Sequence, residues 1–380
     1  MIEPSSISWL GPVGDIGGYG NVSRNYLRAL NLIGLPIQII YNGPIDQELG
    51  KDDILLLSNS QMLHWPVKSL DHTPVLIIHG TPESFAGINK TGYTKKIGIT
   101  IFETDRIPEN WVNLCNDNDM DEIWVPTQFN YRTFTESGVN PSKVKVIHYP
   151  IDFTQYDQEF APYPFPEKVK SFRFLYSIAF DYRKGLDLLI PSYCEEFSDK
   201  EDVSLIIKIY VPGWNNDDNF LKEISSYIPV KENNPHIHFI IEKMPRETLL
   251  SLYSSCTCYV STERACGWGM PQMEMMAMGK PVIAVNWGGV TEFMNQNNSF
   301  LIEREQELEY VHDKLQMSRP ELYLGHKWAK VTKQNVKEKL REAFESHNKR
   351  EEVASQARQD IRNHFSFQKI ASQIKERIFA

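Results

Sequence analysis

One loop of the sequence has the composition of a phosphate-binding site. It is GWGMPQME (267–274), in which Gly267 and Gly269 allow unusual backbone angles and Pro271 suits the first turn of a helix. The first amides of a helix have no partner within it, so they can donate to a phosphate group. The residues that could face such a ligand are Gly267, Trp268, Gly269, Met270 and Pro271. A tight turn before a buried helix is the alternative interpretation.

Glu274 follows this loop, and we expect it in the first turn of the helix, within reach of the same ligand. A carboxylate there can accept hydrogen bonds from two hydroxyls of a ribose, as the acidic residue of dinucleotide-binding folds does. The alternative is a glutamate that only favours the helix dipole, which contributes a few tenths to about 1 kcal/mol.

Two further segments end a strand in a glycine loop with charged residues. In FDYRKGLDL (180–188), Arg183 and Lys184 precede a helix and would suit a diphosphate. In VNWGGVTEF (285–293), we expect Glu292 to open the next helix. A shared pocket for a nucleotide phosphate explains these edges together better than independent turns do.

The N-terminal segment DIGGYGN (15–21) holds another glycine loop, with Gly17, Gly18 and Gly20 between an expected strand and helix. Its spacing differs from the dinucleotide fingerprint G-x-G-x-x-G. A tight strand–helix turn therefore remains an equal interpretation of this loop.

Short apolar runs alternate with helical patterns in two series, which predicts two doubly wound α/β domains. The first series reaches about residue 150 and includes DILLLS (53–58) as a strand. The segment 149–171, rich in proline and aromatic residues, is typical of a linker. In the second series we expect helices at 185–198, 217–228, 246–255 and 271–278. Residues 328–362 are typical of solvated helices, and FSFQKIASQIKERIF is amphipathic.

Composition excludes several classes of function. The 380 residues carry a net charge of -9 and are 41% hydrophobic, so no basic surface for nucleic acid is expected. No apolar run reaches the roughly 20 residues of a membrane span, and a cytoplasmic protein is expected. The five cysteines lack a zinc spacing, so Cys256 and Cys258 are expected to be buried thiols.

The motifs together resemble the family 4 glycosyltransferases, which are retaining enzymes of the GT-B fold. The stretches that carry the resemblance are FDYRKGLDLLIPSY, GWGMPQMEMMAMGKPVIAVNWGGVTEF and, earlier, IGITIFETDRIPENWVNLCN, DEIWVPTQFN and VKVIHYPID. They follow the order of the family and cover most of residues 8–302. The resemblance implies two Rossmann-like domains that face a central cleft, with a C-terminal helix returning to the N-terminal domain.

The resemblance also implies a division of labour. Residues 1–163, completed by 364–380, would bind the acceptor, a carbohydrate or a lipid-linked glycan, with 79–94 as part of that surface. Residues 164–363 would bind a UDP-, GDP- or dTDP-sugar. No cofactor or metal is expected. An acceptor of this kind would be compatible with contact between the protein and the cytoplasmic face of a membrane.

Site residues follow from the same resemblance. Lys184 and Arg183 would hold the diphosphate, the amides around Gly269 and Met270 would touch phosphate or sugar, and Glu274 would bind the ribose. Gly17 and Gly18 would face the donor, and Glu103 would lie beside the reacting sugar.

One position departs from the family. Eight residues before Glu274 the family has a glutamate that contacts the transferred sugar, and this chain has Cys266. A thiol cannot replace a charged acceptor. Three explanations are open: Glu263 takes over, the donor sugar needs no such contact, or the protein binds a sugar nucleotide without turnover. An epimerase or a phosphorylase of the same fold is a further alternative.

Overall fold

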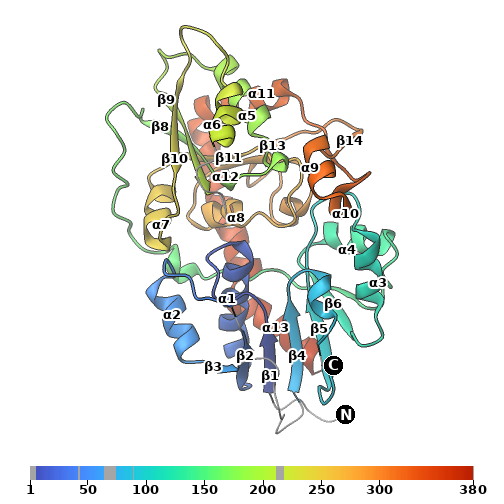
Figure 1. The fold of residues 1–380 in the computed structure, drawn as a ribbon. Coiled ribbons are helices and arrows are strands. Elements are labelled where there is room, and N and C mark those ends of the chain that lie inside the picture. The colour runs from blue at the N-terminus through green and yellow to red at the C-terminus, as the bar shows by residue number, and fades with distance from the viewer. Residues whose placement is uncertain (1–5, 42, 64–73, 89, 211–217, 380) are drawn as a thin grey trace. The chain divides into compact units, whose positions relative to one another are not determined.

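The computed structural model describes the chain except for residues 1–5, 42, 64–73, 89, 211–217 and 380. It divides into two compact units, each with its own sheet (Figure 1). The first unit comprises Met1–Gln155 and Arg362–Ala380, and the second comprises Tyr156–Ile361. The chain thus passes from the first unit to the second inside the proline-rich segment and returns within its last long helix.

The described part of the first unit has a parallel sheet of seven strands in the order β3-β2-β1-β4-β5-β6-β7. Every residue of β4 is buried, as expected for a parallel sheet with both faces covered. The strands are β1 (Ser6–Leu10), β2 (Ile37–Ile40), β3 (Gln61–Leu63), β4 (Pro74–His79), β5 (Lys95–Ile99), β6 (Glu122–Val125) and β7 (Val144–Val146).

The C-terminal helix belongs to the first unit, as predicted. Helix α13 (Phe367–Ile378) packs against α1 (Gly18–Asn31) and buries Ile370, Ile374 and Ile378. An ion pair between Arg377 and Glu122 ties its last turn to β6. The other helices of this unit are α2 (Lys51–Ser58), η1 (Pro82–Phe85), α3 (Glu109–Asn116), α4 (Gln128–Glu136) and η2 (Phe153–Gln155).

The second unit has a parallel sheet of six strands within the described residues, in the order β10-β9-β8-β11-β12-β13. This order is that of a doubly wound sheet, with the switch point between β8 and β11. The predicted fold class is therefore confirmed. The strands are β8 (Phe172–Ala179), β9 (Val203–Tyr210), β10 (His236–Ile241), β11 (Cys258–Ser261), β12 (Val282–Val285) and β13 (Phe300–Ile302).

The four helices expected in the second unit are present, although residue 217 lies outside the described residues. They are α5 (Leu186–Glu196), α6 (Asp218–Ser226), α7 (Arg246–Ser254) and α8 (Met270–Ala277). Two single-turn helices, η3 (Tyr182–Lys184) and η4 (Gly289–Glu292), follow β8 and β12. Helices α11 (Lys333–Glu345) and α12 (His347–Phe365) form the charged region, and α11 packs against α5 through a buried stripe of Val336, Leu340 and Ala343.

Two features differ from expectation. The run DILLLS, predicted as a strand, lies in helix α2, where only Leu57 is buried. Leucine favours helix, and Asp52 and Asp53 in the first turn complement the helix dipole. The sequence also did not predict the small hairpin of β14 (Leu308–Tyr310) and β15 (Lys327–Ala329), or the short helices α9 (Asp313–Ser318) and α10 (Pro320–Tyr323) between its strands.

No helix among the described residues combines the length and the apolar composition needed to cross a membrane.

The glycine loop between β1 and α1 is held by one buried arginine. The Arg24 guanidinium donates to the carbonyl oxygens of Val13 at 2.8 Å and Asp15 at 2.6 Å. A Cβ atom on Gly20 would lie 1.8 Å from that Asp15 oxygen, whereas one on Gly18 would meet nothing within 4 Å. The loop therefore requires glycine at position 20 on steric grounds.

We expect Gly20→Ala to lower the free energy of unfolding by about 1–3 kcal/mol, because the loop must move to admit the methyl group. Gly18→Ala is the matched control and should change it by less than about 1 kcal/mol. Urea unfolding of both variants measures this difference. Equal stability of the two variants would contradict the loop geometry.

Candidate functional site

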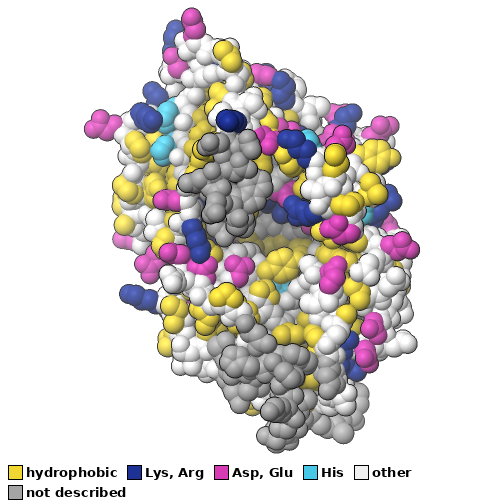
Figure 2. Space-filling model, in the orientation of Figure 1, with side chains coloured by type: hydrophobic (Ala, Val, Ile, Leu, Met, Phe, Trp, Pro, Cys, Tyr) yellow, Lys and Arg dark blue, Asp and Glu magenta, His cyan; other side chains and the backbone are white. Residues whose placement is uncertain are grey.

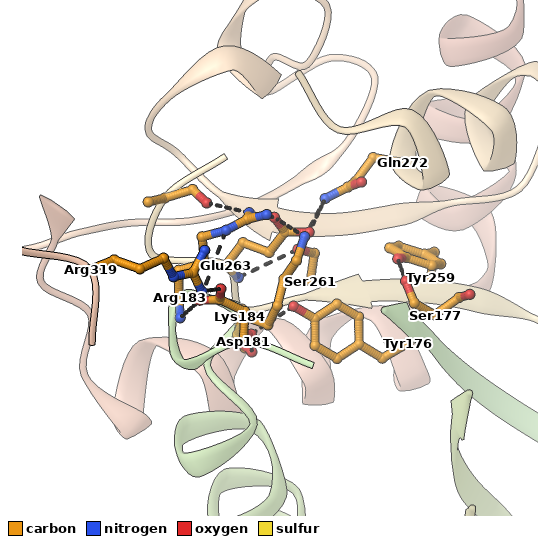
Figure 3. Close-up of polar contacts among 12 residues, drawn as sticks. Tyr176, Ser177, Asp181, Arg183, Lys184, Tyr259, Ser261, Glu263, Gln272 and Arg319 are labelled. Carbon is orange, nitrogen blue, oxygen red and sulfur yellow. Dashed lines mark hydrogen bonds and ion pairs between the residues drawn. The ribbon is translucent and has the colours of Figure 1, made fainter. Parts of the chain in front are cut away.

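A buried cluster of charges lies where β8 and β11 end. Lys184 Nζ is 2.7 Å from Glu263 Oε2, and Arg183 Nη1 is 3.4 Å from the same oxygen (Figure 3). Both cations come from η3, directly after β8, and Glu263 comes from the loop after β11. Only 4% of Glu263 is exposed. The structure thus brings together three predicted site residues at the carboxyl edge of the sheet.

Local geometry explains why the sequence places the two cations there. The Asp181 carboxylate accepts a hydrogen bond from the Arg183 amide at 3.0 Å and so caps η3. Gly185 has a φ of 68°, and a Cβ atom on it would lie 2.4 Å from the Thr262 carbonyl oxygen. Tyr176 Oη donates to the Lys184 carbonyl at 2.6 Å. These contacts fix the backbone of the Arg-Lys pair against the end of β11.

The Glu263 carboxylate is held from both sides. Burial by itself would raise its pKa, but the charges of Lys184 and Arg183 outweigh burial, so the pKa of Glu263 lies below its ordinary value. Gln272 Nε2, from α8, donates to Glu263 Oε1 at 3.3 Å and to Ser261 Oγ at 3.0 Å. Glu263 is therefore an ionised, buried carboxylate with a fixed orientation.

Gln272 and Arg319 belong to this cluster and were missed by sequence reasoning. Arg319, the residue that follows α9, pairs with Asp181 at 3.0 Å and adds a third cation (Figure 3). The spacing within the 267–274 loop could have pointed to Gln272. Arg319 carries no local signal, because it lies 138 residues from Asp181 in the sequence.

The loop 267–269 leads into α8 as predicted. Gly269 caps the helix with a φ of 98°, and Pro271 lies in the first turn. The Gly289 amide donates to the Cys266 carbonyl at 2.6 Å, and a Cβ atom on Gly289 would lie 1.6 Å from the Gly267 oxygen. Trp268 is buried against Phe293, with ring centroids 5.3 Å apart. The loops after β11 and β12 are thus in direct backbone contact.

Glu274 lies beyond the first turn of α8, because the helix begins at Met270, so its expected place was wrong. Its carboxylate forms an ion pair with Arg246 at 2.8 Å instead of stabilising the helix start. Glu292 closes η4 and does not open a helix, since this single turn ends there. The prediction for Glu292 was therefore also wrong.

Cys266 is buried beside the charge cluster. Burial and the charge of Glu263 raise the pKa of its thiol, so the thiol is neutral at physiological pH. All five cysteines are free and buried, including Cys256 and Cys258 as expected. In the described part of the chain, no group of three or more His, Cys, Asp and Glu side chains is arranged to hold a metal ion.

The remaining predicted site residues lie in the first unit. Gly17 caps α1 and Gly18 begins it, and Glu103 lies half-buried in the loop after β5. His79 lies at the end of β4, and the sequence predicts it only as part of the 79–94 acceptor segment. Its Nδ1 is 2.7 Å from Ser23 Oγ, its ring stacks on Tyr19, and its Nε2 has no hydrogen-bond partner among the described residues. Burial lowers the pKa of His79 to about 3, so this strand end presents a neutral imidazole.

A family of known proteins matches part of the second unit. Residues 157–317, which contain the whole cluster except Arg319, match the family described as "Glycosyl transferases group 1". This part of the second unit is therefore similar to the group 1 glycosyl transferases, and it contains the strand ends that carry the charge cluster.

Particular relatives are more distant. The chain is 32% identical to an uncharacterized glycosyltransferase of Methanocaldococcus jannaschii over 127 residues, which are 33% of this chain and 32% of that protein. It is 26% identical to the human alpha-1,3/1,6-mannosyltransferase ALG2 over 219 residues, 52% of this chain and 50% of that protein. The chain therefore spans about a third to a half of the length of these two relatives.

Solved structures share the fold over nearly the whole chain. Anabaena HepE in complex with UDP and glucose has a TM-score of 0.69 at 15% identity and covers 98% of this chain and 99% of its own. A glycosyltransferase from Rickettsia africae has a TM-score of 0.69 at 16% identity, with 99% of each chain covered.

We expect Cys266 to resist alkylation in the native protein at pH 8, because a buried thiol with a raised pKa supplies little thiolate. In denaturant at the same pH, all five cysteines should react. Mass spectrometry after iodoacetamide treatment measures both states. Modification of native Cys266 at the rate seen in the denatured chain would contradict its burial.

Proposed function

We propose that the protein is a retaining glycosyltransferase that moves a sugar from a nucleoside-diphosphate sugar to an acceptor hydroxyl, in glycan or polysaccharide synthesis. The observation that carries the proposal is the buried cluster of Lys184, Arg183 and Glu263 beside the 267–269 loop. It lies at the carboxyl edge of a doubly wound sheet, where such folds bind their ligands. Support also comes from HepE, crystallised with UDP-glucose, and from the human mannosyltransferase.

The chemistry that this site supplies is electrostatic. As the bond from the sugar to the diphosphate breaks, negative charge grows on the leaving phosphate oxygen. Lys184, Arg183 and the first amides of α8 can stabilise that charge without a metal ion. The acceptor hydroxyl attacks the face from which the diphosphate departs and passes its proton to the leaving oxygen. The anomeric configuration is then retained with no covalent intermediate.

The acceptor belongs, in this proposal, to the first unit. Glu103 and the 79–94 segment are its candidate contacts, and the neutral imidazole of His79 joins them as a hydrogen-bonding group. A carbohydrate or a lipid-linked glycan fits aromatic and small polar side chains of this kind.

Glu263 has a particular place in the proposal. It accepts from one of the three donors of the Lys184 ammonium group, so this lysine can also bind a diphosphate. Close to Glu263 lies the buried Cys266, at the position where the family that the chain resembles has its own carboxylate. We propose that Glu263 takes over that role. The neutral thiol of Cys266 favours a second candidate function, a sugar-nucleotide-binding protein without turnover.

Lys184→Ala should lower kcat/KM by about 100- to 1000-fold, because it removes a charge that stabilises the leaving diphosphate. Lys333→Ala, which removes an exposed lysine on α11, is the matched control and should retain activity. The assay follows release of nucleoside diphosphate from a panel of UDP-, GDP- and dTDP-sugars, with and without EDTA, and NMR of the product reports its anomeric configuration. Inversion of configuration, or a requirement for metal, would contradict the mechanism.

Glu263→Gln should lower the rate by about 10- to 150-fold if Glu263 supplies the missing carboxylate. The double variant Glu263→Ser with Cys266→Glu returns the carboxylate to the family position and should recover part of the loss. Unchanged activity in Glu263→Gln would refute this role. If every variant and the parent bind nucleotides but turn over no donor, the second candidate function is correct.

A further inference from the structure

A second buried charge network surrounds Glu274. Arg246 Nη2 and Tyr156 Oη both lie close to Glu274 Oε1, at 2.8 Å and 3.2 Å. Arg246 Nη2 also donates to Tyr156 Oη at 2.7 Å, which closes a triangle of contacts. Glu274 and Tyr156 are 3% and 4% exposed. The carboxylate therefore has its position fixed by two side chains that also hold each other.

The triangle joins three segments at one edge of the second unit. Arg246 is the first residue of α7, which follows β10, and Glu274 is in α8, which follows β11. Tyr156 is the first residue of the unit itself. The carboxyl ends of β10 and β11 lie at the edge where doubly wound sheets bind nucleotides. The network is thus built next to the candidate donor site.

Arg246 keeps its positive charge within this network. Burial disfavours the charge on Arg246, but the combined effect of its partners, of which the Glu274 carboxylate is the first, outweighs burial and raises the pKa of the guanidinium. The guanidinium only donates hydrogen bonds, and an ionised carboxylate only accepts them. A buried ion pair of this kind adds little to stability over apolar packing, so stability alone does not account for it.

We propose that Arg246 and Tyr156 are positioning residues that orient the Glu274 carboxylate toward the 2′- and 3′-hydroxyls of the donor's ribose. This inference rests on the proposed function and narrows its substrate class. An oriented acceptor favours a ribose with both hydroxyls, so the donor is a ribonucleotide sugar, of the UDP or GDP type, and not a deoxyribonucleotide sugar such as dTDP-sugar.

The test measures the dissociation constants of UDP, GDP and their 2′-deoxy counterparts by calorimetry. The wild-type protein should prefer the ribonucleotide by about 10- to 150-fold, the range for a hydrogen bond to a charged group. Arg246→Met should bring the two affinities toward equality, and Arg246→Lys should keep part of the preference. Tyr156→Phe should weaken the preference while leaving the ion pair in place.

Arg341→Met is the matched control, because Arg341 forms part-buried ion pairs with Glu196 and Glu201 in the same unit and contacts none of the three residues. It should keep the full preference. If Arg246→Met does not fold, as judged by its melting transition, Tyr156→Phe decides the outcome.

The results distinguish a failure of the proposed function from a failure of the inference about the ribose. A wild-type protein that binds no nucleoside diphosphate overturns the proposed function and this inference with it. A wild-type protein that binds ribo- and deoxyribonucleotides equally overturns the inference alone. The same holds if the wild type discriminates and the folded Arg246 and Tyr156 variants discriminate equally well.

Discussion

The second unit depends on one buried interaction, the contact of the Glu263 carboxylate with Lys184 and Arg183. Two cations next to each other after a strand would repel, and a buried carboxylate would be costly if it stood alone. Together they form a fixed cluster of charges at the ends of β8 and β11. Three contacts hold this cluster in place: the cap from Asp181, the close approach of Gly185 to Thr262 and the hydrogen bond from Gln272.

Much of this arrangement could be predicted from the sequence. The alternating apolar runs predicted the two doubly wound sheets, and the glycines and proline of the 267–274 loop predicted the start of α8. Patterns of this kind are local, so they are visible in one chain. The partners of the site residues are not local: Arg319 meets Asp181 and Arg246 meets Glu274 through the fold alone. Leucine-rich DILLLS was mistaken for a strand because a short apolar run does not distinguish the two structures.

The two carboxylates of the site are arranged differently from the family pattern. Glu274 keeps the family position but is held by Arg246 and Tyr156, while position 266 carries a neutral thiol and the charge lies three residues earlier, at Glu263. The segment thus keeps two buried carboxylates, although the first lies three residues before the position of the carboxylate in the family it resembles. In our account, this shift keeps the site charged and able to act on a sugar nucleotide.

The central claim is that the Lys184 cluster binds the diphosphate of a donor. The most direct measurement compares how strongly UDP or GDP, and the matching nucleosides, raise the melting temperature of the wild-type protein and of Lys184→Ala. A ligand at 100 times its dissociation constant stabilises the folded state by about 2.7 kcal/mol. We predict that the diphosphates stabilise the wild type far more than the nucleosides do, and that Lys184→Ala loses this difference. An equal difference in both proteins would contradict the account.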